Sequence, residues 1–419
     1  MTRLEELIKE LCPEGVTYKT LGEIASDVFR GSGITREQVR ETGTPCVRYG
    51  EIYTTYGVWF EKCVSHTDET LLTSKKYFGY GDILFAITGE SVDDIAKCCA
   101  YIGHETCLAG GDIVVLKHNE SPKYLSYALS TLDAQKQKSK GKVKSKVVHS
   151  SVPDIKALRI PVPPLPVQEE IVRILDSFTE LTAELTAELT ARKKQYEYYR
   201  DKLLTASDFV IKKIALSDLF LTRNGYTPST SNQEFWNSND VPWFRMEDIR
   251  ENGRVLSDAI QHVSKKAVKG NPFPPNSIIV ATSATIGEHA LITCESLANQ
   301  RFTYLMLRNE YKEKYNIKFL FYYCYLLDEY CKANLNQGNF ASVDMKQFAK
   351  FEFPLLPLSI QNKIVQILDN FDSICSDLKI GLPAEIEART KQYEYYRDKL
   401  LSFKETPTYE QKKEISKTE

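Results

Sequence analysis

Apolar residues recur at intervals of three and four positions in two long stretches of the chain, the spacing that places them on one face of a helix. The first stretch runs from Ile171 to Leu203 and the second from Ile364 to Leu400. A helix of about 37 residues is roughly 55 Å long at 1.5 Å per residue. Pro383 falls inside the second stretch. Because proline removes a backbone hydrogen bond, we expect that helix to be interrupted nearby.

Shorter apolar runs precede each long stretch. Runs rich in valine, isoleucine and phenylalanine, such as residues 83–86 (ILFA) and 278–281 (IIVA), alternate with glycines and polar turns. This alternation is typical of strands in a mixed α/β domain. Prolines at 161–164 and 354–357 then close each domain, since residues that precede proline avoid the helical region. Helical spacing of leucines and Ile8 between residues 4 and 11 predicts a short additional helix.

The chain also repeats itself, which decides its domain organisation. Residues 194–204 and 391–401 are both KQYEYYRDKLL, and weaker similarities link the rest of the two halves, such as 45–48 (PCVR) with 242–245 (PWFR). We therefore predict two tandem half-molecules, each a domain followed by a helix. The predicted boundaries are 1–167 for the first domain, 168–212 for the first spacer helix and linker, 213–360 for the second domain, 361–404 for the second spacer helix, and 405–419 for a charged, disordered tail.

Each long helix could lie on the core of its own domain, but two helices with narrow apolar seams favour packing against each other as a coiled-coil-like spacer. Because both halves run from domain to helix, a pseudo-two-fold arrangement makes these helices antiparallel, with the domains at opposite ends. The predicted fold class is α/β, with two tandem mixed α/β domains joined by two long antiparallel helices.

Composition limits the possible functions. The formal net charge is -2, so contact with nucleic acid would need local basic patches. No apolar run reaches the roughly 18 residues of a spanning helix, and no signal peptide is evident, so we expect a cytoplasmic protein. The ten cysteines form no CxxC pair, which favours reduced, buried thiols over a metal site. We find no GxGxxG, GxxxxGK, HExxH or GxSxG motif and expect no catalysis.

Several motifs, in their order along the chain, resemble the specificity (S) subunit of type I restriction-modification systems. The resemblance covers nearly the whole chain, and each half contains a proline-rich junction followed by a glutamine, Gln168 or Gln361. The first half departs from the pattern at residues 89–91 (GES) and 109–111 (AGG). The second half carries the motifs at 224–228 (NGYTP), 241–249 (VPWFRMEDI), 284–287 (ATIG) and 298–300 (ANQ).

This resemblance implies two target-recognition domains, each reading one half of a split, asymmetric DNA sequence. It also implies two methyltransferase (M) subunits, which bind S-adenosylmethionine and methylate adenine, and ATP-dependent restriction (R) subunits. The chain itself would hold no cofactor. Two identical copies of KQYEYYRDKLL suit two copies of one partner. A recent duplication is the alternative, but the domains have diverged far more than these segments, which favours a shared constraint. A scaffold that does not read DNA is the alternative function. The expected partner contacts are Tyr196, Tyr199, Arg200, Tyr393, Tyr396 and Arg397.

The first predicted helix contains the tetrapeptide TAEL twice, at residues 182–185 and 186–189. Four residues lengthen a helix by about 6 Å, compared with 3.4 Å per base pair of DNA. We hypothesise that the number of TAEL copies sets the distance between the two DNA half-sites.

The strongest basic signal lies in residues 135–147, which we expect to form a mobile loop. Its ammonium groups would neutralise phosphates, although a solvated loop without a partner remains the alternative. The equivalent segment of the second half, residues 334–343, carries side-chain amides that can hydrogen-bond to the edges of adenine bases. The lysines are Lys136, Lys138, Lys140, Lys142, Lys144 and Lys146, and the amides are Asn336, Gln337 and Asn339.

Arg48 and Arg245 occupy matching positions beside Glu51 and Asp248, so ion pairs within the domains and DNA contact explain them equally well. Polar turns at the ends of predicted strands supply the remaining DNA-binding candidates, which are Ser283, Thr285, Gln300 and Arg301.

Overall fold

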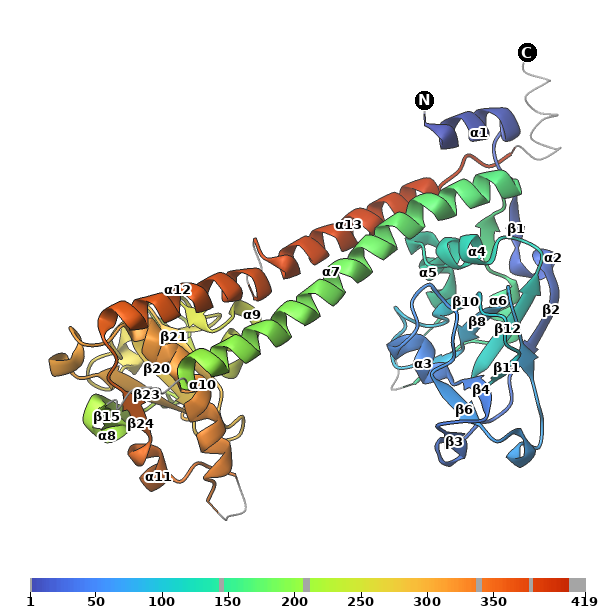
Figure 1. Ribbon diagram of the computed structural model, residues 1–419. Coiled ribbons are helices and arrows are strands. Elements are labelled where there is room, and N and C mark those ends of the chain that lie inside the picture. The colour runs from blue at the N-terminus through green and yellow to red at the C-terminus, as the bar shows by residue number, and fades with distance from the viewer. Residues whose placement is uncertain (1, 143–146, 206–211, 337–340, 377–379, 407–419) are drawn as a thin grey trace. The chain divides into compact units, whose positions relative to one another are not determined.

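The computed structural model describes residues 2–142, 147–205, 212–336, 341–376 and 380–406. The chain forms two compact units (Figure 1). The first unit combines residues 1–183 with 388–419, and the second contains residues 184–387. Each unit therefore contains a mixed α/β domain, the beginning of the long helix that follows this domain, and the end of the other long helix.

The first unit is built on two five-stranded sheets. In the first sheet all pairings are antiparallel except β10–β5, which is parallel. Every residue of β8 and β10 is buried, as expected for continuous apolar runs. The first sheet has the order β2 (Ala25–Arg30), β12 (Ile113–His118), β8 (Ile83–Ala86), β10 (Cys98–Tyr101), β5 (Trp59–Phe60), and the second β3 (Val39–Arg40), β6 (Ser65–Thr67), β4 (Thr44–Val47), β11 (Cys107–Ala109), β7 (Tyr77–Phe78).

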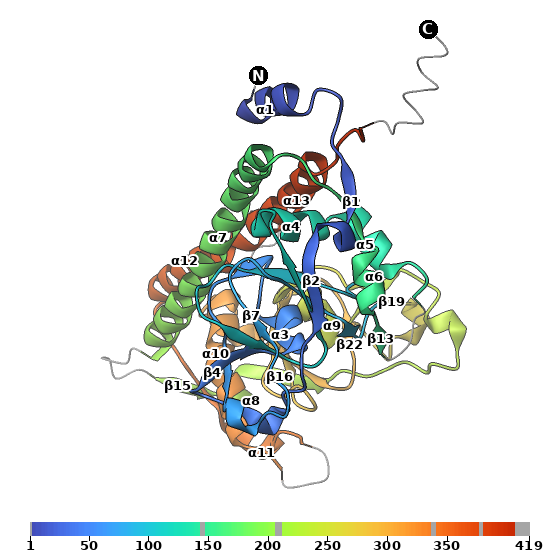
Figure 2. The same cartoon turned by 90° about the vertical axis from the view of Figure 1, so that its right-hand side faces the viewer.

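Short strand pairs and helices complete the first unit. Helix α4 lies against β10 and β8, and α1 confirms the helix expected near residue 4 (Figure 2). The pairs are β1 (Tyr18–Thr20) with β14 (Arg159–Pro161) and β9 (Thr88–Gly89) with β13 (Val148–His149), and the helices are α1 (Arg3–Leu11), α2 (Leu21–Ile24), α3 (Tyr49–Thr54), α4 (Pro122–Leu129), α5 (Leu132–Ser139) and α6 (Val152–Lys156).

The second unit repeats this plan. Its five-stranded sheet again ends in a parallel pair, β21–β18, and α10 lies against β21 as α4 lies against β10 (Figure 1). The sheets are β16 (Phe220–Asn224), β23 (Phe302–Leu307), β20 (Ser277–Ala281), β21 (His289–Ile292), β18 (Val255–Leu256); β19 (His262–Val263), β17 (Val241–Phe244), β22 (Leu297–Ala298); and β15 (Lys213–Ala215) with β24 (Glu352–Pro354). The helices are α8 (Leu216–Leu219), α9 (Met246–Asn252), α10 (Ile317–Ala333) and α11 (Met345–Lys350).

The long helices agree with the predicted pattern. Helix α7 (Leu165–Thr205) is continuous, whereas the second stretch is divided into α12 (Leu358–Cys375) and α13 (Leu382–Leu400). The expected interruption is confirmed, with Pro383 in the first turn of α13, where its missing N–H does no harm. In contrast, the expected loop at residues 135–147 is wrong in its first part, because Lys136 and Lys138 belong to α5.

Within the second unit, α7 and α12 run antiparallel. Phe371 on α12 contacts Tyr196 and Tyr199 on α7, with ring centroids 6.1 and 5.8 Å apart. Four residues further along α12, Cys375 lies near Arg192 and Lys193, which precede those tyrosines. The first unit contains the matching ring contact, in which Phe178 of α7 stacks on Tyr396 of α13 at 5.5 Å.

Candidate nucleic-acid interface and helix junctions

A buried glutamine fixes the start of each long helix. In the first unit, the Gln168 amide oxygen accepts from the Ser121 backbone N–H at 3.0 Å, and its nitrogen donates to the Pro163 carbonyl at 2.7 Å. In the second unit, Gln361 accepts from Asn316 at 2.9 Å and donates to Leu356 at 2.8 Å. Both side chains are fully buried. This amide ties the loop, the helix N-terminus and the domain together, which explains the repeated proline-to-glutamine motif.

An aspartate eight residues further on makes a second repeated contact. In the first unit, Asp176 accepts from Lys123 Nζ and from the Tyr127 hydroxyl, both at 2.7 Å. In the second unit, Asp369 accepts from Lys318 at 2.8 Å and from Tyr322 at 2.7 Å. Our sequence analysis missed these residues. The signal was present, because both aspartates follow the junction glutamine by eight positions and both lysines precede a tyrosine by four.

The two copies of KQYEYYRDKLL pack in opposite units. Tyr196 is 7% exposed in the core of the second unit, whereas Tyr393 lies in the first unit with its ring 6.3 Å from Tyr127. Each copy therefore packs against the domain of the other half of the chain. The rings of Tyr196 and Tyr393 thus make contacts within the chain, and their predicted role as partner contacts stays a prediction.

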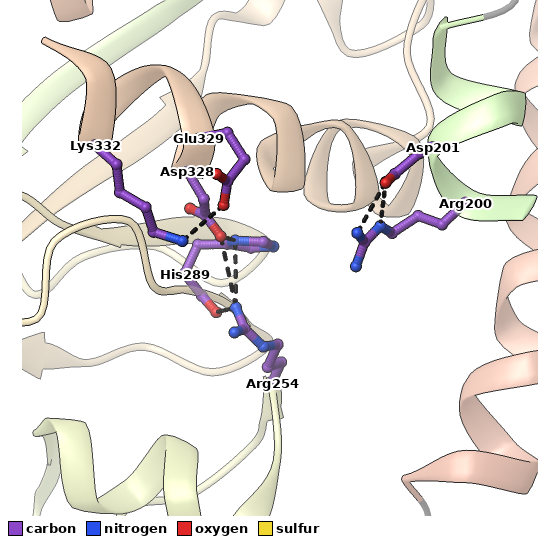
Figure 3. Close-up of polar contacts among 7 residues, drawn as sticks. All are labelled: Arg200, Asp201, Arg254, His289, Asp328, Glu329 and Lys332. Carbon is purple, nitrogen blue, oxygen red and sulfur yellow. Dashed lines mark hydrogen bonds and ion pairs between the residues drawn. The ribbon is translucent and has the colours of Figure 1, made fainter. Parts of the chain in front are cut away.

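The outward face of each copy holds different tyrosines. Tyr198 is 61% and Tyr395 60% exposed, and our prediction omitted both. Tyr199 is 39% and Tyr396 36% exposed, and both stack on phenylalanines of the facing helices. The predicted arginines make local ion pairs. Arg200 pairs with Asp201 at 2.8 Å (Figure 3), and Arg397 pairs with Asp398 at 3.0 Å.

The lysine-rich segment divides into exposed and buried side chains. Lys136 and Lys140 are exposed, and Lys142 pairs with Asp154 at 2.7 Å. Lys138 is only 5% exposed, its Nζ donates to the Leu129 carbonyl at 2.7 Å, and burial lowers its pKa. Lys138 is thus a structural residue that cannot reach a phosphate from this position. Lys144 and Lys146 lie outside the described residues.

A polar cleft in the second unit brings together three predicted residues from separate segments. Arg245, Gln300 and Arg301 line a cavity of about 620 Å³. The rest of its lining is Thr227, Trp243, Met246, Glu247, Arg250, Glu251 and Asn299, so three arginines face two carboxylates. The Thr227 hydroxyl donates to the Gln300 amide oxygen. Arginine and amide side chains around one opening are the groups that bind phosphates and base edges. We call this cavity the arginine cleft.

The matched arginines are held differently in the two units. Arg48 Nε contacts Glu51 at 2.9 Å, so the ion pair within the domain is formed in the first unit, and DNA contact by Arg48 stays a prediction. Arg245 pairs with Glu247 at 2.8 Å instead of Asp248, because the Asp248 carboxylate accepts from the backbone N–H of Arg245 at 2.6 Å. Glutamate has one more methylene than aspartate, so Glu51 reaches both the backbone N–H and the guanidinium of Arg48.

Three other DNA-binding candidates, Ser283, Thr285 and Asn336, lie in or near the segment that follows β20. Ser283 forms a bridge with Ser342, and the Asn336 amide donates to the Val343 carbonyl at 3.1 Å. The Thr285 hydroxyl is buried without a hydrogen-bond partner in the described part of the chain. These residues do not line the arginine cleft. Gln337 and Asn339 lie outside the described residues.

Matching glycines explain one of the weak similarities between the halves. A Cβ added to Gly31 would lie 2.1 Å from the Gly110 carbonyl oxygen, and one added to Gly225 would lie 2.3 Å from the Asn299 oxygen. Only glycine allows the chain at the end of β2 or β16 to approach this turn so closely. In the second unit this turn carries Asn299 and Gln300, whereas the first unit has glycines.

The structure contains no disulfide among the ten cysteines, all of which lie within the described residues. The cysteines are free thiols, all buried except Cys63 and Cys294, as predicted. Among the described residues, no group of three potential ligands from histidine, cysteine, aspartate and glutamate is placed to hold a metal ion. The described helices include none with the length and apolar character needed to cross a membrane.

Residues 13–192 and 210–388 each match the type I restriction modification DNA specificity domain. The chain belongs to this family. It is 50% identical to the EcoprrI specificity subunit of Escherichia coli over 215 residues, covering 49% of this chain and 53% of that protein. It is 36% identical to the EcoR124I/EcoR124II specificity subunit of the same species, covering 68% of this chain and 72% of the relative.

A crystal structure of the S subunit from M. genitalium shares the fold of this specificity-family chain. The TM-score is 0.53 at 16% identity, and the match covers 92% of this chain and 96% of that structure. The predicted fold class is confirmed, with two tandem α/β domains and long helices.

Proposed function

We propose that this chain is the DNA-reading subunit of a type I restriction-modification complex, that it reads a bipartite asymmetric target, and that it is not itself catalytic. One observation carries the proposal. The helix junctions of the two units use the same contacts, while the polar surfaces at the matched strand ends differ. Two domains with the same fold but different polar surfaces suit a protein that recognises two different DNA half-sites.

We further propose that two methyltransferase subunits bind the outward faces of the identical KQYEYYRDKLL copies, and that restriction subunits join this core. S-adenosylmethionine and ATP would then be bound by those partners. The exposed Tyr198 and Tyr395 support this assignment, since each copy leaves an equivalent tyrosine available. Work on chromosomal DNA implies a cytoplasmic location.

A map of methylated adenines across the genome, with and without this gene, tests the function. We expect one two-part motif with a fixed gap to disappear when the gene is deleted. An unchanged map, in cells where the methyltransferase partners are expressed, would contradict DNA reading and favour a scaffold.

The exposed lysines of α5 and the residues after it give a second prediction. Replacing Lys136 and Lys140 with glutamine should weaken DNA binding and reduce the slope of log affinity against log salt by about 2, close to 0.9 for each lost phosphate contact. Titration of the assembled complex at several salt concentrations measures this slope. Lys312→Gln with Lys314→Gln, which removes two exposed charges from the second unit, is the control. A slope that stays constant in the α5 variant would contradict DNA contact at this segment.

A further inference from the structure

The second unit contains a groove on which the proposed function does not depend. Residues 249–260, which include the end of α9 and all of β18, form one wall, and helices α10 and α12 form the other. The volume of this open groove is about 1080 Å³. We call this cavity the β18 groove. Its lining shares only Arg250 and Glu251 with the arginine cleft.

The matched place in the first unit is filled by a side chain. Trp59 on β5 pairs with Ala100, and Val255 on β18 pairs with Leu291 at the same register of the repeated sheet. The Lys123 ammonium lies 3.9 Å from the centre of the Trp59 ring. In the second unit, Lys318 occupies the position of Lys123 and lines the open groove, beside a valine that is 44% exposed. At this register the first unit therefore carries a tryptophan where the second unit carries a smaller valine.

The groove is acidic. It has two more carboxylates than cations, so the local potential opposes the phosphates of a nucleic acid and attracts a cation. Asp372 has no cation within ion-pair distance among the described residues, and burial raises its pKa. The carboxylates are Glu251, Asp258, Glu288, Asp369 and Asp372, and the cations are Arg250, Arg254 and Lys318.

Two of the three cations are already held by the protein. Lys318 pairs with Asp369 at 2.8 Å. Arg254 donates to the backbone oxygen of His289 at 3.1 Å and lies 3.7 Å from Asp328 (Figure 3). Asp258 is also paired, since it contacts His262 Nε2 at 2.7 Å. Among the described residues, the carboxylates of the groove wall without an ion pair are therefore Glu251, Glu288 and Asp372, and these can receive an outside cation.

The groove also offers apolar and aromatic surface. The ring of Tyr325 contacts two guanidinium groups, with its centroid 4.3 Å from Cζ of Arg200 and 5.1 Å from Cζ of Arg254. Val255 and Ile260 line the opening and are 44% and 46% exposed. Acidic groups beside apolar side chains match a protein segment that carries both basic and apolar residues.

We propose that the β18 groove binds a segment of a partner protein subunit in which lysine or arginine accompanies apolar side chains. This inference rests on the proposed function, since it requires the chain to work within a multisubunit complex. Trp59 fills the matched place of the first unit, so the groove adds one contact per chain. The outward faces of the KQYEYYRDKLL copies occur twice in the chain. The β18 groove occurs once, so a partner segment bound there would make the complex asymmetric.

Photo-cross-linking within the complex tests the proposal. Val255 is replaced by p-benzoylphenylalanine, and the chain is reconstituted with its methyltransferase and restriction subunits and irradiated. We expect a cross-link to one partner segment that contains lysine or arginine, and none from the same residue placed at position 59. Cross-links only to this chain or to DNA, in a complex that still assembles and methylates, would overturn the groove proposal alone.

Filling the groove provides a second measurement. Val255→Trp copies the residue that the matched site of the first unit already accommodates, so the variant should fold. We expect it, and Glu288→Gln with Asp372→Asn, to weaken binding of the cross-linked subunit at least 10-fold without changing the DNA motif read. Trp59→Val is the control and should leave binding unchanged. Unaltered binding in both groove variants would overturn the proposal. Failure of the unaltered chain to bind any partner would overturn both this proposal and the proposed function.

Discussion

Tyr196→Ala should destabilise the second unit by about 3 kcal/mol, the usual cost of truncating a buried aromatic side chain. Tyr196 precedes the second domain in the chain and follows the first, yet its ring is 7% exposed in the core of the second unit, against Phe371. The loss of stability should therefore appear in the second unit, although Tyr196 belongs to the helix that follows the first domain. Hydrogen exchange followed by peptide mass spectrometry measures this, with amides of β20 and β23 exchanging about 100-fold faster.

The repeat supplies the matched variant. Tyr393→Ala removes the identical residue of the other copy, which lies in the first unit beside Tyr127, and should accelerate exchange in β8 and β12 instead. Tyr198→Ala changes a side chain that is 61% exposed and should leave exchange unchanged while weakening methyltransferase binding. Faster exchange confined to the first unit in Tyr196→Ala would refute the assignment of that copy to the second unit.

Local rules predicted the regular elements from sequence. Buried strands such as β8 and β20 are short apolar runs bounded by turns, and the break before α13 follows from Pro383. These features depend on the backbone and on neighbours within a few residues. The tandem repeat then gave the common plan of the two units, because similar local patterns form similar elements.

Long-range packing determined what the sequence could not predict. Lys138 looks like its neighbours in a lysine-rich segment, but α5 turns its side chain toward the Leu129 carbonyl and the interior. The sequence of the KQYEYYRDKLL copies does not reveal which domain each contacts. Both units offer an equivalent tyrosine bonded to an equivalent aspartate, Tyr127 with Asp176 and Tyr322 with Asp369. Arg245 pairs with Glu247 because the carboxylate of the shorter Asp248 already accepts from a backbone N–H. The sequence alone does not show which of these two carboxylates is available.

The candidate DNA surface was predicted in part. The structure places Arg245, Gln300 and Arg301 around one cleft, although more than fifty residues separate the first from the others. Strand pairing explains this, since β17 and β22 run parallel and their ends meet. The β18 groove gave no signal in sequence, because Val255 is an ordinary strand residue until it is compared with Trp59 at the same register.

Deleting residues 186–189, one copy of TAEL, should abolish methylation of the original target and create a target with a shorter gap. Helix α7 is continuous from Leu165 to Thr205, so the deletion shortens it by about 6 Å at 1.5 Å per residue. At 3.4 Å per base pair this corresponds to one or two base pairs. The half-sites themselves should be unchanged, because neither domain is altered.

Replacing residues 186–189 with four alanines separates helix length from side-chain identity. This variant keeps the length of α7 and has high helix propensity, so we expect it to methylate the original target with the original gap. Methylome sequencing of cells carrying each variant reads the motif directly. An original gap after deletion would show that the helix does not set the spacing, and a changed gap with alanines would show that TAEL side chains, and not the number of residues, determine it.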